Sequence, residues 1–128
     1  MAFATVRFED IIAWQKAYAF ALATYKLTRT YPESERFGLC SQFQRAAISI
    51  SANIAEGYKK ISKADKLRFF NIAQGSLEES RCYVHLSKDL GYISLSDYED
   101  LYAKLEETSK FLNAYCRAVV NDAYRKDQ

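Results

Sequence analysis

The side chains of this sequence that most suggest a zinc site are those of one histidine and three cysteines. Cys82 and His85 stand three positions apart, a spacing that places two zinc ligands on one helical face. We expect Cys40 at about the same level of the fold and Cys116 at its other end, so a fourth ligand is missing. The sequence therefore predicts free thiols and no metal site.

The sequence also lacks the residue patterns of known catalytic sites. A di-iron bundle needs a Glu-x-x-His motif on each of two helices, but the residue three positions before His85 is Cys82. A single histidine supports no Ser-His-Asp set, and no glycine-rich phosphate loop is present. Glu78 and Glu79 are adjacent, so on a helix their side chains point about 100° apart. We predict that the protein is not an enzyme and uses no cofactor.

Segment 59–68 is the most strongly charged stretch of the chain. It holds five cations and one acid, and Tyr58 and Phe69 flank it. A basic loop beside aromatic rings can contact phosphates and stack on a base, although most charge runs are ordinary solvated turns. The residues that we expect to contact nucleic acid are Tyr58, Lys59, Lys60, Lys63, Lys66 and Arg68.

Four stretches of apolar residues at helical spacing are expected to position these groups. They predict an all-α fold, an antiparallel up-down-up-down four-helix bundle that forms one domain over residues 1–128. The predicted helices cover about 8–30, 34–57, 62–90 and 95–121. We expect Gly57 to end the second helix, Ser62 to cap the third, and Gly75 to lie in tight contact with another helix.

This topology separates the charges into two poles. The chain start, the second connection and the chain end share the basic pole, and the first and third connections share the acidic pole. The cations of the basic pole are Arg7, Lys59, Lys60, Lys63, Lys66, Arg68, Arg117, Arg125 and Lys126.

Polar residues set into the second helix predict a structural network. In the register of an antiparallel hairpin, Arg45 lies near Glu79 of the third helix, and we expect an ion pair between them that fixes this register. Asn53 and Glu56 are expected to make similar contacts nearer the basic pole. The alternative is that Arg45, Asn53, Glu56 and Glu79 contact a ligand directly.

Composition sets the cellular context that we expect. The chain has 128 residues, a net charge of +2, and no apolar run long enough to span a membrane. An odd number of cysteines and no signal peptide predict a cytoplasmic location. Ten tyrosines and eight phenylalanines, together with two apolar seams on the first helix, indicate a second buried surface between subunits.

Four blocks of the sequence resemble the four-helix-bundle proteins encoded in 23S ribosomal RNA intervening sequences, and the resemblance runs from about Phe8 to Val119. The most specific block is Arg45-Ala46-Ala47-x-Ser49-Ile50-x-x-Asn53-Ile54-Ala55-Glu56-Gly57. Supporting blocks are Trp14-Gln15-Lys16-Ala17, Ile72-Ala73-x-Gly75-Ser76-Leu77-x-Glu79 and Leu90-Gly91-Tyr92-Ile93. Two departures are Gln44 where the family often has arginine, and Lys59 and Lys60 where arginine often follows the Glu-Gly pair; lysine keeps the charge but loses the bidentate grip on phosphate.

The resemblance implies an assembly and a kind of partner. Related proteins resemble the accessory protein of diversity-generating retroelements, a homopentameric ring whose basic surface binds nucleic acid and a reverse transcriptase. Our first hypothesis is an oligomeric bundle, a homopentamer by this analogy, that binds structured RNA or DNA through its basic pole. The second is an interaction scaffold that docks a partner protein such as a reverse transcriptase.

Overall fold

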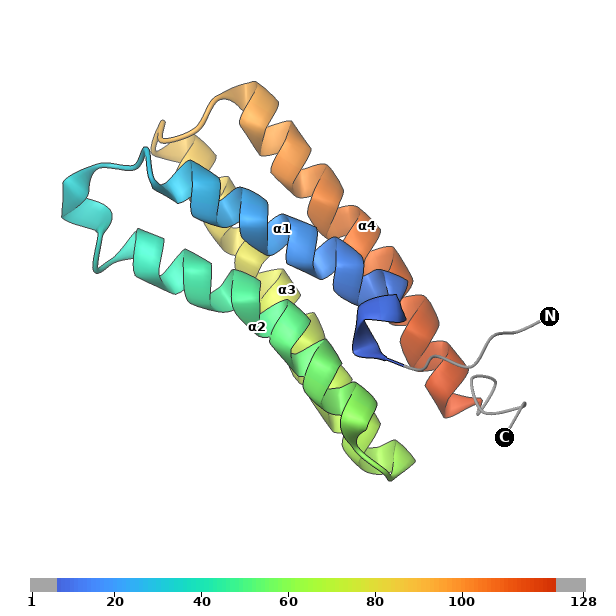
Figure 1. Ribbon diagram of the computed structural model, residues 1–128. Helices are drawn as coiled ribbons and strands as arrows, with labels where there is room; N and C mark the ends of the chain where they lie inside the picture. Colours follow the sequence, from blue (N-terminus) through green and yellow to red (C-terminus); the bar gives the residue numbers. More distant parts are fainter. Residues whose placement is uncertain (1–6, 122–128) are drawn as a thin grey trace.

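Four long helices run alternately up and down around one apolar core in the computed structural model, which describes residues 7–121 (Figure 1). The all-α antiparallel four-helix bundle expected from the sequence is confirmed. The helices are α1 Ile12–Thr28, α2 Leu39–Lys59, α3 Lys63–Asp89 and α4 Leu95–Val120, and the 3-10 turns η1 Phe8–Asp10 and η2 Glu33–Glu35 precede α1 and α2.

The helices form a square in which α1 packs on α2 and α4, while α3 packs on the same two neighbours. Helices α1 and α3 are therefore diagonal to each other. Phenylalanine and leucine side chains fill the centre. Completely buried examples are Phe20, Phe43, Phe70, Leu101 and Leu105.

One apolar seam of α1 packs into this core, and the other is covered only in part, since its residues Ile11 and Ala21 are buried too. Ala13, Ala17, Phe20 and Thr24 are buried, whereas Tyr18 and Tyr25 on the other seam are exposed. One bundle cannot cover both seams, so a stripe of large apolar side chains remains on the outer face of α1.

The starts of the first two helices differ from the sequence-based ranges. The backbone of Ile11 is extended, which separates η1 from α1, so the α-helix begins at Ile12 and not near residue 8. Helix α2 begins at Leu39, after η2 and Gly38. There the carboxylate of Glu35 accepts a hydrogen bond of 3.1 Å from the Leu39 amide, which would otherwise lack an intrahelical partner.

The prediction that Gly57 ends the second helix is wrong, because α2 continues to Lys59. A Cβ atom at position 57 would lie 2.6 Å from Cε1 of Phe70, closer than two carbon atoms can pack. Gly57 therefore allows α3 to approach the backbone of α2. Gly75 is exposed, and no heavy atom lies within 4 Å of where its Cβ would be. The tight contact with another helix that we expected at Gly75 is therefore not made within the described chain.

Side-chain caps define the starts of the other two helices. Ser62 accepts a hydrogen bond from the Asp65 amide at 3.1 Å, and Ser94 accepts one from the Asp97 amide at 3.0 Å. Gly91, with a φ of 76°, follows the C-terminus of α3 in the left-handed conformation that glycine tolerates.

Two long-range hydrogen bonds tie the connections together at the acidic pole. The Tyr92 hydroxyl donates to Oε2 of Glu35 at 2.8 Å, and the Tyr31 hydroxyl donates to Oγ of Ser87 at 2.6 Å. The loop before α2 is thus attached to the end of α3. Within residues 7–121, none of the helices has the length and apolar character of a membrane span.

Candidate nucleic-acid interface

A turn of only three residues, 60–62, connects α2 to α3 at the basic pole. Lys66, in the first turn of α3, donates a hydrogen bond to the backbone carbonyl of Tyr58 in the last turn of α2. The same ammonium group lies 5.4 Å from the centre of the Tyr58 ring. The carbonyls at a helix C-terminus carry partial negative charge, so this position suits a cation.

Lys66 is only 8% exposed, and this changes its predicted role. A side chain buried against the end of α2 cannot reach a phosphate without breaking that contact. The structure therefore assigns Lys66 to helix capping in place of the phosphate contact that the sequence suggested.

Lys63 also reaches the end of a helix. Its Nζ atom donates to the carbonyl of Val120 at 2.9 Å, across from α3 to the last residue of α4. This bond shows directly that the second connection and the end of α4 share one pole. Arg125 and Lys126, which we also expected at this pole, lie outside the described residues.

The other three candidate cations, Lys59, Lys60 and Arg68, lie around the α2–α3 turn. Lys59 and Arg68 are exposed, and Lys60 is half-buried. The Nζ of Lys60 lies 4.8 Å from the centre of the Phe69 ring, and the guanidinium of Arg68 lies 4.6 Å from it. Arg68 is 4.0 Å from Asp65, an exposed pair that contributes little to stability.

The six residues that the sequence selected therefore form one surface with two kinds of member. Lys66 lies within the hairpin and Lys63 bridges to α4, whereas Lys59 and Arg68 are exposed and Lys60 is half-buried beside the Phe69 ring. Tyr58 is half-buried beneath Lys66, so its ring helps to hold the hairpin. Sequence spacing could not separate these roles, because they depend on where the ends of α2 and α4 lie.

Charge still distinguishes the two poles among residues 7–121. The basic pole holds seven cations and the carboxylates of Glu9, Asp10, Glu56 and Asp65. The acidic pole holds six carboxylates and the cations Arg29, Arg36 and Lys88. A nucleic-acid backbone would meet a favourable potential only at the first of these poles.

The polar contact between α2 and α3 is made by small residues. Oγ of Ser49 and Oγ of Ser76 are 2.8 Å apart across the two helices. Asn53 donates through Nδ2 to the carbonyl and the hydroxyl oxygen of Ser49, at 2.8 and 2.9 Å. Asn53 thus lies in a polar network, but its partner is Ser49 on the same helix, and Ser49 in turn contacts Ser76 of α3.

The expected ion pair between Arg45 and Glu79 does not form in the described structure. Both residues are exposed, and Glu79 instead accepts a hydrogen bond of 2.8 Å from the Tyr83 hydroxyl one turn along α3. Glu56 is exposed as well. These three side chains lie on the outer faces of their helices, which explains why they do not join the network around Ser49.

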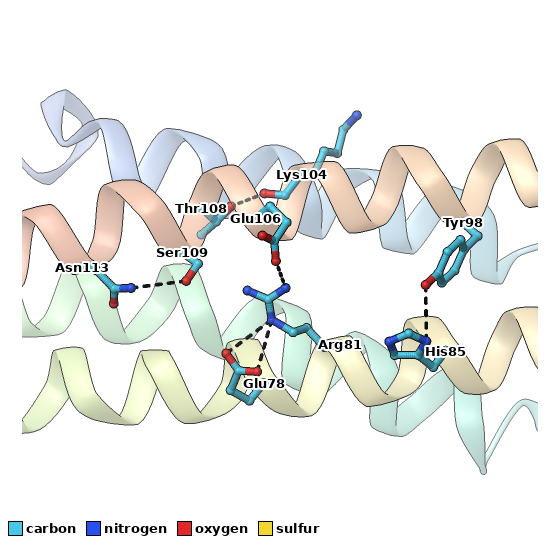
Figure 2. Close-up of polar contacts among 9 residues, drawn as sticks. All are labelled: Glu78, Arg81, His85, Tyr98, Lys104, Glu106, Thr108, Ser109 and Asn113. Atoms are coloured by element: carbon cyan, nitrogen blue, oxygen red, sulfur yellow. Dashed lines mark hydrogen bonds and ion pairs between the residues drawn. The ribbon is translucent and has the colours of Figure 1, made fainter.

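A second group of polar side chains joins α3 to α4 (Figure 2). Arg81 of α3 forms an ion pair with Glu106 of α4 and is 3.2 Å from Glu78 on its own helix. Nearer the acidic pole, the His85 ring packs against Tyr98 and Tyr102, with centroid distances of 5.6 and 5.5 Å, and the two tyrosine rings lie 5.8 Å apart. His85 therefore contributes to an aromatic contact between the helices.

The three cysteines are free thiols. Burial raises the pKa of the Cys40 thiol, which donates to the carbonyl of Thr28 at 3.6 Å, and burial likewise raises the pKa of Cys116. Across residues 7–121, no three His, Cys, Asp or Glu side chains are grouped as metal ligands would be.

Comparison with known proteins agrees with this fold and these sequence blocks. No protein with a curated description matches the chain. A crystal structure of a protein of unknown function from the S23 ribosomal protein family of Bacteroides thetaiotaomicron is similar, with 28% identity and a TM-score of 0.74 over 82% of this chain and 98% of the other. The family model for 23S rRNA-intervening sequence proteins matches residues 9–114. The chain therefore belongs to the family of 23S rRNA-intervening sequence proteins.

Proposed function

We propose that this protein is a non-enzymatic, oligomeric bundle that binds structured RNA or DNA through its basic pole. The observation that carries the proposal is the arrangement of Lys59, Lys60 and Arg68 around the α2–α3 turn. Lys59 is the last residue of α2, Lys60 lies in the connection and Arg68 lies in the second turn of α3. Because the backbone that carries these charges is already ordered by two packed helices, little order is lost when phosphates bind. Electrostatic contacts to phosphates provide most of the affinity in sequence-independent binding.

Exposed apolar side chains on opposite sides of the bundle support an oligomer. Tyr18, Leu22 and Tyr25 are 39–48% exposed on the outer face of α1, and Ile72 and Leu86 are each 43% exposed on the outer face of α3. Because α1 and α3 are diagonal, one patch of a copy could pack on the other patch of the next copy. Head-to-tail contacts of this type close into a ring when the rotation between successive copies completes a full turn, and a ring would repeat the basic pole around its axis.

Fluorescence anisotropy with a structured RNA and a duplex DNA, each at two salt concentrations, tests the nucleic-acid proposal. We expect affinity to fall steeply with salt, because binding releases counterions. The variant Lys59→Glu/Lys60→Glu should lose binding and keep its helicity and mass in solution. A matched variant with the same charge change at the acidic pole, Arg29→Glu/Arg36→Glu, should bind as the native protein does. The absence of binding at low salt would contradict the proposal.

A second candidate function is a scaffold that docks a partner protein, such as a reverse transcriptase. The observation that favours it lies at the acidic pole, where Phe37 is 85% and Leu95 is 64% exposed. Both side chains lie at the pole that holds six carboxylates, although Arg36 lies over the Phe37 ring at 5.3 Å from its centre. Exposed apolar side chains at an acidic pole suit a protein partner with a basic rim. Binding that tolerates salt and is lost in Phe37→Ser/Leu95→Ser would favour this function over the first.

A further inference from the structure

Ile61 stands at the apex of the α2–α3 turn and is 94% exposed, the largest exposure among the large apolar side chains of residues 7–121. Single exposed apolar residues are common on protein surfaces. This one is unusual in its position, because three lysines, at positions 59, 60 and 63, lie within two residues of it.

The turn that carries Ile61 is held from both sides. Lys66 joins the end of α2 to the start of α3, and Ser62 caps α3 directly after Ile61. The close approach of Phe70 to Gly57 also fixes how the two helices pack. Gly57 precedes the turn on α2, and Phe70 follows it on α3. A side chain on so short and constrained a connection keeps its direction when it meets a partner.

The aromatic rings near the turn are already in use. Lys66 lies over Tyr58, and Lys60 and Arg68 lie over Phe69. A base that stacked on either ring would have to displace these cations. Ile61 is thus the apolar side chain of this surface that can enter a base stack without disturbing the protein.

We propose that Ile61 is a wedge that inserts between bases at an unstacked step, so that the basic pole prefers RNA or DNA containing a bulge to a continuous duplex. This inference rests on the proposed nucleic-acid function and specifies the kind of structure that is bound. Proteins insert single isoleucine, leucine or phenylalanine side chains into base steps while flanking cations contact the phosphates. Opening the stack requires least energy where a base is already unpaired.

A membrane surface is a less suitable partner for the same feature. Interfacial anchors bury an extended apolar face of an amphipathic helix, whereas here one isoleucine projects among lysines.

The test compares the full-length protein with Ile61→Ser on two labelled RNA hairpins that differ only by a bulge, with 2-aminopurine next to it. The native protein should bind the bulged hairpin about tenfold more tightly, equal to about 1.4 kcal/mol, and 2-aminopurine fluorescence should rise on binding. Ile61→Ser should lose the preference and the fluorescence change but keep the salt dependence. The control Leu95→Ser, at the opposite pole, should behave like the native protein.

The outcomes separate this inference from the proposed function. Equal binding of both hairpins by the native protein, or an unchanged preference in Ile61→Ser, would overturn the wedge and leave phosphate binding intact. Failure of the native protein to bind either hairpin would overturn both. Co-sedimentation with vesicles of phosphatidylserine and phosphatidylcholine that is lost in Ile61→Ser, while RNA binding is retained, would identify Ile61 as a membrane contact and also overturn the wedge.

Discussion

The Nζ atom of Lys66 donates a hydrogen bond to the backbone carbonyl of Tyr58, eight residues earlier in the chain, and so joins the first turn of α3 to the last turn of α2. The lysine is buried in an otherwise solvated basic segment. Its charge therefore stabilises the hairpin, while neighbouring lysines remain at the surface.

Replacement of Lys66 should affect stability more than binding. We expect Lys66→Met to lower the free energy of unfolding by about 1–2 kcal/mol, because a charged hydrogen bond at a helix C-terminus is lost. Urea denaturation measures this change. Lys59→Met, at an exposed position, should leave stability unchanged and reduce the salt dependence of nucleic-acid binding. One variant should therefore change stability and the other should change binding.

The two helical glycines predict opposite responses to alanine. Gly57→Ala places a methyl group against the fully buried Phe70 ring and should destabilise the fold by about 1–3 kcal/mol through overpacking. Gly75→Ala adds a methyl group in open space within a helix and should stabilise it by about 0.5–1 kcal/mol. Thermal unfolding of both variants provides the comparison, and equal effects would contradict it.

Arg81 should contribute measurably to the contact between α3 and α4. Its side chain is only 16% exposed and pairs with Glu106 across the helices. We expect Arg81→Met to lower the free energy of unfolding by about 1–2 kcal/mol, since a partly buried charged hydrogen bond is removed. Lys104→Met, which breaks the more exposed pair with Asp100 within α4, should change stability by about 0.5 kcal/mol or less.

Stability should decrease in acid partly because of Glu35. Its pKa lies below the ordinary value of 4.5, because the carboxylate accepts hydrogen bonds from the Leu39 amide and then from the Tyr92 hydroxyl. A lowered pKa in the folded state means that the stabilisation is complete above pH 4.5 and is lost as pH falls through the lowered value. In a plot of melting temperature against pH, Glu35→Gln should reduce the decrease in melting temperature at acidic pH. Glu99→Gln, at an exposed position of the same pole, should leave that decrease unchanged.

Charges on the outer face of α1 should disrupt the proposed oligomer. We expect Tyr18→Glu/Leu22→Glu to lower the mass measured by light scattering without loss of helicity, because carboxylates would be desolvated in an interface. Lys110→Glu, at an exposed position of α4, makes the same change in net charge away from the outer face of α1 and provides the control. An unchanged mass in the double variant would place the contact elsewhere.

Sequence periodicity predicted the parts of this structure that depend on local order. The number of helices, their alternating direction and the cap at Ser62 follow from the spacing of apolar and capping residues. The shared pole of the α2–α3 turn and the end of α4 followed from topology alone.

The remaining features depend on which side chain meets which neighbour. Gly57 looks like a helix terminator until Phe70 is placed beside it, and Lys66 looks like a surface lysine until the end of α2 is known. The Arg45–Glu79 pair was inferred because both residues were expected at a similar height along the bundle axis. Whether two residues at the same height face each other depends on the rotation of each helix about its own axis. A single sequence specifies the height of a residue along the bundle better than the rotation of its helix.

The square arrangement of the helices also has a consequence for folding kinetics. Three of the four helix pairings, α1–α2, α2–α3 and α3–α4, join consecutive helices through short connections. Only the α1–α4 pairing has to close a long loop. Proteins dominated by such local contacts fold in microseconds to milliseconds, so we expect rapid refolding in which the docking of α1 against α4 completes the bundle.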